Sequence, residues 1–357
     1  FDSGRHPLQA RCVQLARMGC VVFHYDMEGY ADSVQLDHRK STMAAHGLFT
    51  VKAELRQQNM MGIQSYNSIR ALDFMETLPE VDLERIGVTG ASGGGTQTFV
   101  LGAVDDRPDL LFPAVMVSTA MQGGCVCENA NYLRVDAGNI DIAALALPRP
   151  LGLTGADDWT VEIETKGKPD LASLYAMAGV PNRFAVFPNL QFGHNYNAVS
   201  RQAMYEFVSQ HFQLGHQEPI AERDFTPLTQ NEMSVWTEEH PAPRNRGAAH
   251  EQGLLRWWAE DSHAQMTALA LRMPDDTSAT EAFHEIVGGA WKTILGRTLA
   301  EVGSIDHTLS AKVETDQGTA MTGLLTTLMH EEQVPALFLH PAEGWNGQVI
   351  LMVNGVE

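Results

Sequence analysis

Five consecutive small residues, Gly90-Ala91-Ser92-Gly93-Gly94, fit the pattern Gly-x-Ser-x-Gly. The apolar run Ile86 to Thr89 precedes them and a helix-forming stretch follows, which predicts a sharp turn between a strand and a helix. Such a turn holds its serine in a strained backbone conformation with the hydroxyl exposed above the sheet. Ser92 is therefore the candidate nucleophile for acyl transfer.

Gly93 opens the expected helix, so its backbone N–H can donate to an oxyanion developing on a substrate carbonyl, aided by the helix dipole. The alternative interpretation is a glycine-rich turn that only packs a helix on the sheet or cradles a phosphate. The nucleophile is favoured because suitable partners for it follow further along the chain.

A serine hydroxyl is a poor nucleophile until a base takes its proton. The predicted base is His194, which stands in a loop after the apolar run Phe184 to Phe187 and before a helix expected over Arg201 to Phe212. The order serine, acid, histidine along the chain is the one that accompanies such a turn. The chain has 14 histidines, and most of the others are expected at the surface or in the core.

A carboxylate that orients the imidazole is expected after the apolar run Leu151 to Thr154, and the sequence offers Asp157 and Asp158 there. Only one of them can face the imidazole Nδ1–H, and the other would cap a helix or lie in solvent. We favour Asp158. Glu128, after the run Pro113 to Ser118, is a third candidate, although a role in ordering its own loop is preferred for it.

The elements that must position these residues alternate between helix and strand. Strands are expected at Cys20 to Tyr25, Ile86 to Thr89, Pro113 to Ser118, Leu151 to Thr154 and Phe184 to Phe187, and helices at 6–18, before Pro79, after Ser92 and at 201–212. This alternation is typical of an α/β fold with a mostly parallel sheet covered by helices on both faces.

Length and proline distribution predict more than one domain. We expect a catalytic domain over 1–215 and a proline-rich linker over 216–250. A partial second domain is expected over 251–357, with helices over 254–271 and 282–295 followed by three β-like runs near Ser310 to Glu314, Leu324 to Leu339 and Val349 to Val353.

Composition excludes several partners. The formal net charge of -20 disfavours nucleic acid, which binds clustered Lys and Arg, and no apolar run is long enough to cross a bilayer.

The four cysteines are too few for a disulfide scaffold, and Cys125 with Cys127 is a weak zinc signal. We expect no metal and no organic cofactor.

Four segments together resemble the acetyl xylan esterase-like α/β-hydrolases of environmental bacteria. They are Asp26 to Ser33, Gly87 to Thr98, Gly155 to Thr160 and Phe192 to Tyr196. The resemblance covers roughly residues 1–215 and implies a serine carboxylic ester hydrolase acting on a small-molecule or carbohydrate ester. Ser92, Asp158 and His194 match the triad positions of that family. The sequence does not determine the compartment, and the periplasm or the outside of a bacterium is kept as an expectation.

Two other functions remain open at this point. A peptidase or amidase uses the same triad, and a non-catalytic carbohydrate-binding or scaffold module would keep the fold without the chemistry. Turnover of p-nitrophenyl acetate separates an esterase from an amidase, and covalent labelling of Ser92 by a fluorophosphonate separates both from a binding module.

The sequence departs from the family at both ends. It starts inside the first helix of the resemblance, and the part after about residue 216 resembles the start of a second hydrolase unit, so we expect a fragment of a longer tandem protein. The three β-like runs, Val349 to Val353 among them, resemble the strands missing from the front. We favour an independent partial domain for them. The alternative is that they complete the first sheet, within the chain or by strand exchange in a homo-oligomer, with Asn354-Gly355-Val356 near the second oxyanion donor position.

Overall fold

The computed structural model describes residues 5–37, 47–120, 123–125, 128–134 and 137–352. The chain divides into two compact units, Phe1–Thr280 and Glu281–Glu357. This division falls beyond the linker predicted over 216–250 and beyond the predicted start of a second domain at residue 251. The contacts of one long helix, described below, account for the difference.

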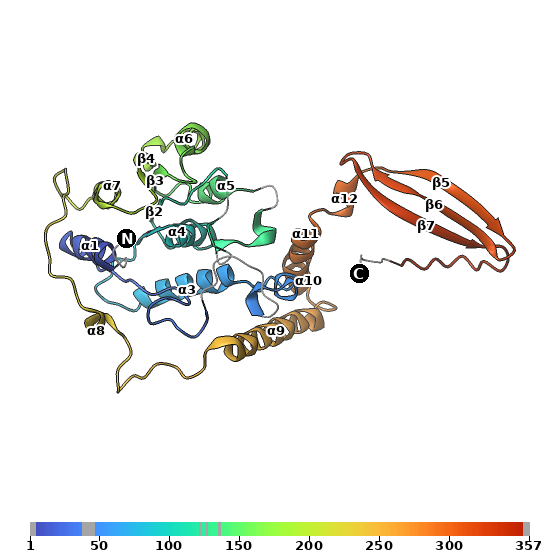
Figure 1. Ribbon diagram of the computed structural model, residues 1–357, viewed down its shortest axis with the longest axis horizontal. Helices are drawn as coiled ribbons and strands as arrows, with labels where there is room; N and C mark the ends of the chain where they lie inside the picture. The colour runs from blue at the N-terminus through green and yellow to red at the C-terminus, as the bar shows by residue number, and fades with distance from the viewer. Residues whose placement is uncertain (1–4, 38–46, 121–122, 126–127, 135–136, 353–357) are drawn as a thin grey trace. The chain divides into compact units, whose positions relative to one another are not determined.

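The first unit is built on a four-stranded parallel sheet in the order β1-β2-β3-β4 (Figure 1). Its strands are β1 (Gly87–Ala91), β2 (Leu110–Ala114), β3 (Leu151–Asp157) and β4 (Phe184–Gly193). Every residue of β2 is buried, as expected for a central strand covered on both faces. The predicted α/β fold with a parallel sheet is confirmed.

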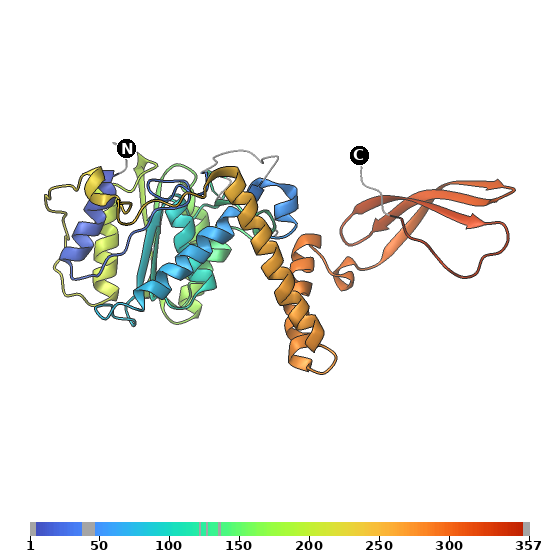
Figure 2. The same ribbon diagram turned by 90° about the horizontal axis from the view of Figure 1, so that it is seen from below.

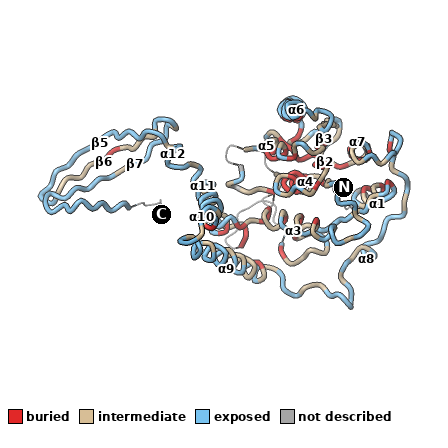
Figure 3. Tube along the Cα trace, turned by 180° about the vertical axis from the view of Figure 1, so that it is seen from behind, coloured by how far each residue is buried: buried red, intermediate tan, exposed pale blue. Residues whose placement is uncertain are grey.

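Helices cover both faces of this sheet. The helices of the first unit are α1 (Arg5–Arg17), α2 (Val51–Glu54), α3 (Met60–Met75), α4 (Gly93–Val104), α5 (Asn139–Ala144), α6 (Lys168–Met177), α7 (Ala198–His211), α8 (Gln230–Met233) and α9 (Gly247–Arg272), with α10 (Thr277–Phe283) reaching across the division. Side chains of α4, α5 and α6 form one apolar cluster with the sheet, and side chains of α7 and Met18 after α1 form another. Figure 3 shows the buried residues concentrated around α4 and β2.

The predicted strand Cys20 to Tyr25 is not a strand in the structure. The segment follows α1, as expected, but it joins no ladder with any described residue. Its sequence has the β-branched and aromatic residues of a strand, and a strand also requires a hydrogen-bonding neighbour. The strand next to it in the predicted order is β1, and among the described residues β1 pairs only with β2.

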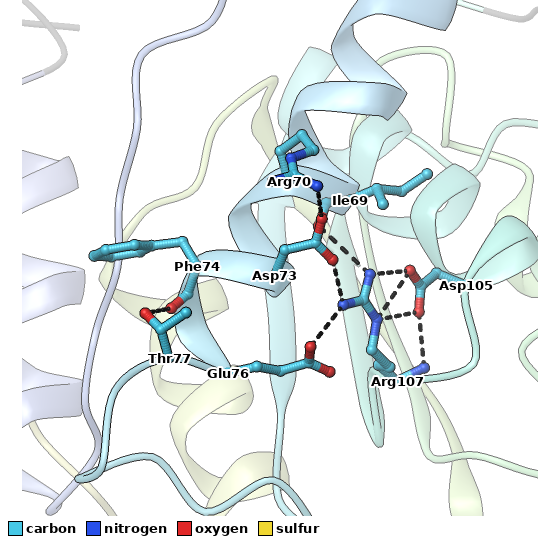
Figure 4. Close-up of polar contacts among 8 residues, drawn as sticks. All are labelled: Ile69, Arg70, Asp73, Phe74, Glu76, Thr77, Asp105 and Arg107. Carbon is cyan, nitrogen blue, oxygen red and sulfur yellow. Dashed lines mark hydrogen bonds and ion pairs between the residues drawn. The ribbon is translucent and has the colours of Figure 1, made fainter.

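A charged cluster joins the end of α3 to the turn that follows α4 (Figure 4). The Arg107 guanidinium donates to Asp105 and Asp73 and lies 3.3 Å from a carboxylate oxygen of Glu76. These hydrogen bonds raise the pKa of Arg107 further above its ordinary value, with Asp105 as the largest contributor. The cluster fixes the end of α3 against the turn that follows α4.

The long helix α9 packs on the first unit. Trp258 joins the third apolar cluster, with Leu48 and Met60 among its buried members. The carboxylate of Glu251, only 5% exposed, accepts a hydrogen bond from the Leu48 amide at 2.9 Å. These contacts place α9 in the first unit, and Figure 2 shows its N-terminal end beside the helices of that unit.

The second unit holds short helices and an antiparallel sheet of three strands in the order β5-β6-β7. Its elements are α11 (Gly289–Leu295), α12 (Leu299–Val302), β5 (Ile305–Thr315), β6 (Gly318–Thr327) and β7 (Glu332–Pro341). The predicted run Leu324 to Leu339 is in fact two strands, because the chain turns between Thr327 and Glu332. Residues 349–352 form no strand. Among all described helices, none combines the length and apolarity of a membrane span.

Candidate active site

Ser92 stands at the turn between β1 and α4, in a backbone conformation that few non-glycine residues adopt. Its φ is 56° and its ψ is -123°. Gly90 is required at this turn because a Cβ there would collide with the backbone carbonyl of Gly94. The turn is also bonded to the neighbouring strand, because the Ser92 amide donates to the Ala114 carbonyl of β2 at 3.1 Å.

Gly93 is the first residue of α4. None of the described residues accepts a hydrogen bond from its amide, so this N–H at the positive end of the helix dipole is available to a developing oxyanion. Two residues on, a Cβ on Gly95 would meet the Met116 Cβ at 2.8 Å and the Ala114 carbonyl oxygen at 2.9 Å. The glycine-rich sequence thus lets α4 approach the sheet closely.

His194 and Asp158 are brought together by the register of β3 and β4. The last paired residues of the two strands are Asp157 and Gly193, so the next residue of each chain emerges at the same edge. His194 Nδ1 lies 2.7 Å from Asp158 Oδ2. The Asp158 side chain is only 4% exposed, whereas that of His194 is 28% exposed and accessible from the cavity.

Asp158 is held by its own turn as well as by the imidazole. The Thr160 amide and hydroxyl both donate to Asp158 Oδ1, at 2.7 and 2.5 Å. Burial raises the pKa of the Asp158 carboxyl, but the hydrogen bonds from His194 and Thr160 outweigh it, so the pKa lies below its ordinary value. Asp158 is therefore an ionised carboxylate that can stabilise an imidazolium.

The other two candidate acids occupy different positions. Asp157 is the last residue of β3 and its side chain is exposed. Glu128 is only 7% exposed and accepts from the Gly124 amide at 2.7 Å. Its carboxylate lies against Gly93, since a Cβ on that glycine would meet Glu128 Oε1 at 2.6 Å. Of the three carboxylates, Asp158 is the one hydrogen-bonded to His194.

Burial changes the chemistry of Glu128. Burial raises the pKa of its carboxyl. The Gly124 and Cys125 amides and the charge of His194 lower that pKa, but the effect of burial is larger. Glu128 thus orders its loop, as the sequence predicts, and it also lies within electrostatic range of the imidazole.

Trp159 was not assigned a role from the sequence, although it follows Asp158 directly. Its ring lies over the imidazole of His194, with centroids 4.4 Å apart and an interplanar angle of 42°. The Trp159 indole N–H donates to the Val115 carbonyl at 3.2 Å. Val115 has a φ of 49°, which is strained for a β-branched residue. Trp159 therefore packs against the imidazole and restricts its movement.

Ser92 and His194 line one cavity of about 710 Å³. Its walls are mostly apolar, with contributions from β1, α3 and the segment Cys20 to Tyr25. An apolar cavity with a few convergent polar groups is the usual setting of a small-molecule site.

No metal site is found within the described part of the chain, where no three His, Cys, Asp or Glu side chains gather. The weak zinc signal involved Cys125 and Cys127, and Cys127 lies outside the described residues. Residues 353–357, which include the expected second oxyanion segment Asn354-Gly355-Val356, also lie outside them.

Comparisons with known proteins give a family of esterases, a hydrolase and a solved esterase structure. Residues 3–118 match the family model of acetyl xylan esterases, AXE1. A protein of Bacillus subtilis (strain 168) that carries the name hydrolase YtaP is 27% identical over 206 residues, which cover 55% of this chain and 66% of the Bacillus protein. The solved structure of methylesterase BT1017 matches with a TM-score of 0.60 and 26% identity, covering 74% of this chain and 57% of that one.

The chain thus spans less than two thirds of the length of the relatives it matches. The match to the solved methylesterase structure agrees with the α/β fold described above. The predicted resemblance of this chain to the acetyl xylan esterase-like α/β-hydrolases is confirmed.

Proposed function

We propose that the chain is a serine carboxylic ester hydrolase that removes an acyl group from a carbohydrate ester. Ser92 is the nucleophile, His194 the general base and Asp158 the acid that orients the imidazole. The observation that carries the proposal is the 2.7 Å contact between His194 Nδ1 and Asp158 Oδ2, together with the cavity that His194 lines with the strained Ser92.

The proposed reaction has two halves. In the first, Ser92 Oγ attacks the ester carbonyl while His194 Nε2 takes the hydroxyl proton, and the imidazolium is stabilised by Asp158. The Gly93 amide donates to the oxyanion. Collapse of the tetrahedral species breaks the ester C–O bond, and His194 returns the proton to the alcohol that leaves.

In the second half, water replaces the alcohol. His194 takes a proton from the water, whose oxygen attacks the acyl carbonyl of the acyl-Ser92 ester. Collapse of this second tetrahedral species releases the carboxylic acid and returns the proton to Ser92 Oγ. The carbohydrate assignment is supported by the match to the acetyl xylan esterase family over residues 3–118.

Two measurements test this function. Wild-type protein should hydrolyse p-nitrophenyl acetate and acetylated xylo-oligosaccharides and should be labelled at Ser92 by a fluorophosphonate. Ser92→Ala should lose both properties, whereas Ser173→Ala, a change at an exposed serine of α6, should keep them. Folded wild-type protein that resists labelling would favour a binding module, and faster turnover of a peptide amide than of the esters would favour an amidase.

A further inference from the structure

The strand that leads to Ser92 has one unpaired edge. β1 hydrogen-bonds to β2, and on its other side no strand is found among the described residues. Whereas every residue of β2 is buried, Val88 and Thr89 of β1 are only half-buried. The cavity of about 710 Å³ lies along this open edge, with Val88, Thr89 and Ser92 in its lining.

A second segment of the cavity wall pairs with no strand among the described residues. This segment is Cys20 to Tyr25, and its Val21, Phe23 and Tyr25 are 46%, 44% and 38% exposed. Two contacts fix the segment to α3. The Phe23 and Phe74 rings are 5.1 Å apart, and the Tyr25 hydroxyl lies 2.7 Å from that of Ser68.

The cavity is therefore a slot between two backbone edges, each with N–H and C=O groups that lack partners in the sheet. Helices close it on both faces. Cys12 and Leu15 of α1, Leu72 and Met75 of α3 and Met204 of α7 line it. A chain segment that fits between the edges must be extended, and it must be apolar on both faces, like other strands of a covered parallel sheet.

The chain itself contains such a segment. Val349, Ile350, Leu351 and Met352 are four consecutive apolar residues, and they are 83%, 88%, 85% and 77% exposed. They form no strand or helix. We propose that this segment of a second copy of the chain inserts between Cys20–Tyr25 and β1, so that two copies exchange strands and complete each other's sheet.

The area that such an exchange buries is sufficient for a stable dimer. Burial of one Val, Ile, Leu or Met side chain removes on the order of 100 Å² of apolar surface from water. A reciprocal exchange buries two segments, or roughly 800 Å² of strand surface, and the walls of the two slots lose a comparable area. The total reaches the range of about 1,200–2,000 Å² that is typical of stable interfaces.

The exchange also bears on the candidate active site. A strand parallel to β1 runs toward the edge of the sheet at which Ser92 and His194 lie, since β1 leads directly into Ser92. It would fill the apolar space beneath the serine turn and give β1 hydrogen bonds on both edges. Strand exchange does not depend on the proposed ester hydrolysis, because it involves only the open edge of the sheet and the apolar segment.

The first test measures the oligomeric state of the full chain by size-exclusion chromatography with light scattering. Wild-type protein at micromolar concentration should be a dimer. Ile350→Asp and Leu351→Asp should be monomeric, because a charge cannot enter the apolar slot. The matched control Leu299→Asp changes a residue of the same unit that is 93% exposed and should leave the dimer intact. A monomeric wild-type chain, or dimeric Asp variants, would overturn the proposal.

The second test locates the inserted segment. Cys12 and Cys20 line the slot, so Ile350→Cys should give a covalent dimer under mild oxidation. Leu299→Cys should not. Replacing both Cys12 and Cys20 with serine should abolish the cross-link of Ile350→Cys, whereas a disulfide between two copies of the new cysteine would persist. A cross-link within a single chain contradicts exchange between copies, and a covalent dimer that persists without Cys12 and Cys20 contradicts insertion of the segment into this slot.

Discussion

The Tyr196 hydroxyl lies 2.7 Å from the Thr89 hydroxyl, and this contact ties the loop of the candidate base to the strand of the candidate nucleophile. Thr89 donates its own proton to the Phe112 carbonyl at 2.8 Å, so Tyr196 is the donor between the two hydroxyls. Burial raises the pKa of Tyr196 to about 12, which keeps the phenol protonated and able to donate.

Tyr196→Phe should therefore loosen the His194 loop without removing any group that reacts. Loss of one buried hydrogen bond lowers the free energy of unfolding by about 0.5–1.5 kcal/mol. We expect kcat for p-nitrophenyl acetate to fall by about tenfold, which corresponds to about 1.4 kcal/mol. Wild-type kcat in a variant whose stability has fallen would show that the hydrogen bond serves folding alone.

Ser92 gives a pair of substitutions that should have the same effect on activity and different effects on stability. Ser92→Ala and Ser92→Gly should both lose ester hydrolysis by at least about 10³-fold, because each removes the nucleophile. A φ of 56° is strained for alanine as for serine, whereas glycine adopts it freely. Thermal unfolding should therefore show Ser92→Gly to be more stable than Ser92→Ala by about 1 kcal/mol. Residual esterase turnover at the wild-type rate in either variant would exclude Ser92 as the nucleophile.

Much of the site follows from local sequence, because turns and strand ends leave local signals. The pattern around Ser92 predicts its turn, and Gly90 is there for the steric reason that the pattern implies. The runs before Asp158 and His194 predict β3 and β4, whose carboxyl ends must lie at one edge of a parallel sheet.

Other features depend on contacts between distant parts of the chain, and no local pattern indicates them. The strained φ of Val115 and the tilted ring contact of Trp159 with His194 require the strand register. The strand predicted at Cys20 to Tyr25 was wrong because periodicity reports side-chain burial and does not report whether a neighbouring strand is present. The helix α9 was predicted, but its packing on Leu48 was not.

The two adjacent aspartates provide a matched comparison. Asp158→Asn should lower kcat by about 10³–10⁴-fold, because a neutral amide can no longer stabilise the imidazolium and favours the wrong imidazole tautomer. Asp157→Asn changes an exposed side chain and should leave kcat within about twofold of wild type. Steady-state kinetics with p-nitrophenyl acetate measures both, and a larger loss in Asp157→Asn would move the acid to that residue.

Asp158 should also contribute to stability in a defined pH window. Its pKa is lowered in the folded chain, so the stabilisation is complete above the unfolded pKa of about 3.9 and is lost as the pH falls through the folded value. The stabilisation of wild type relative to Asp158→Asn, measured as a difference in Tm, should therefore be present at neutral pH and should shrink below about pH 4. A difference that is unchanged in acid would mean that the ionised carboxylate contributes nothing to folding.

Glu128 should show the opposite pH dependence. Burial raises the pKa of its carboxyl, so the folded chain favours the protonated form. The contribution of Glu128 to stability is complete below the unfolded pKa of about 4.3 and is lost as the pH rises through the higher folded value. Glu128→Gln keeps an oxygen that can accept from the Gly124 amide and removes the buried charge. Its Tm should exceed that of wild type at pH 7, and the two should converge below about pH 4.

The same variant separates a structural from a catalytic role for Glu128. The carboxylate lies against Gly93 and within electrostatic range of His194, but the hydrogen bond to the imidazole comes from Asp158. Glu128→Gln should therefore reduce kcat by about tenfold or less, equivalent to about 1.4 kcal/mol, while its stability at pH 7 rises. A loss of kcat as large as that of Asp158→Asn would instead make Glu128 a second acid for His194, and a lower Tm at pH 7 would mean that its charge stabilises the loop.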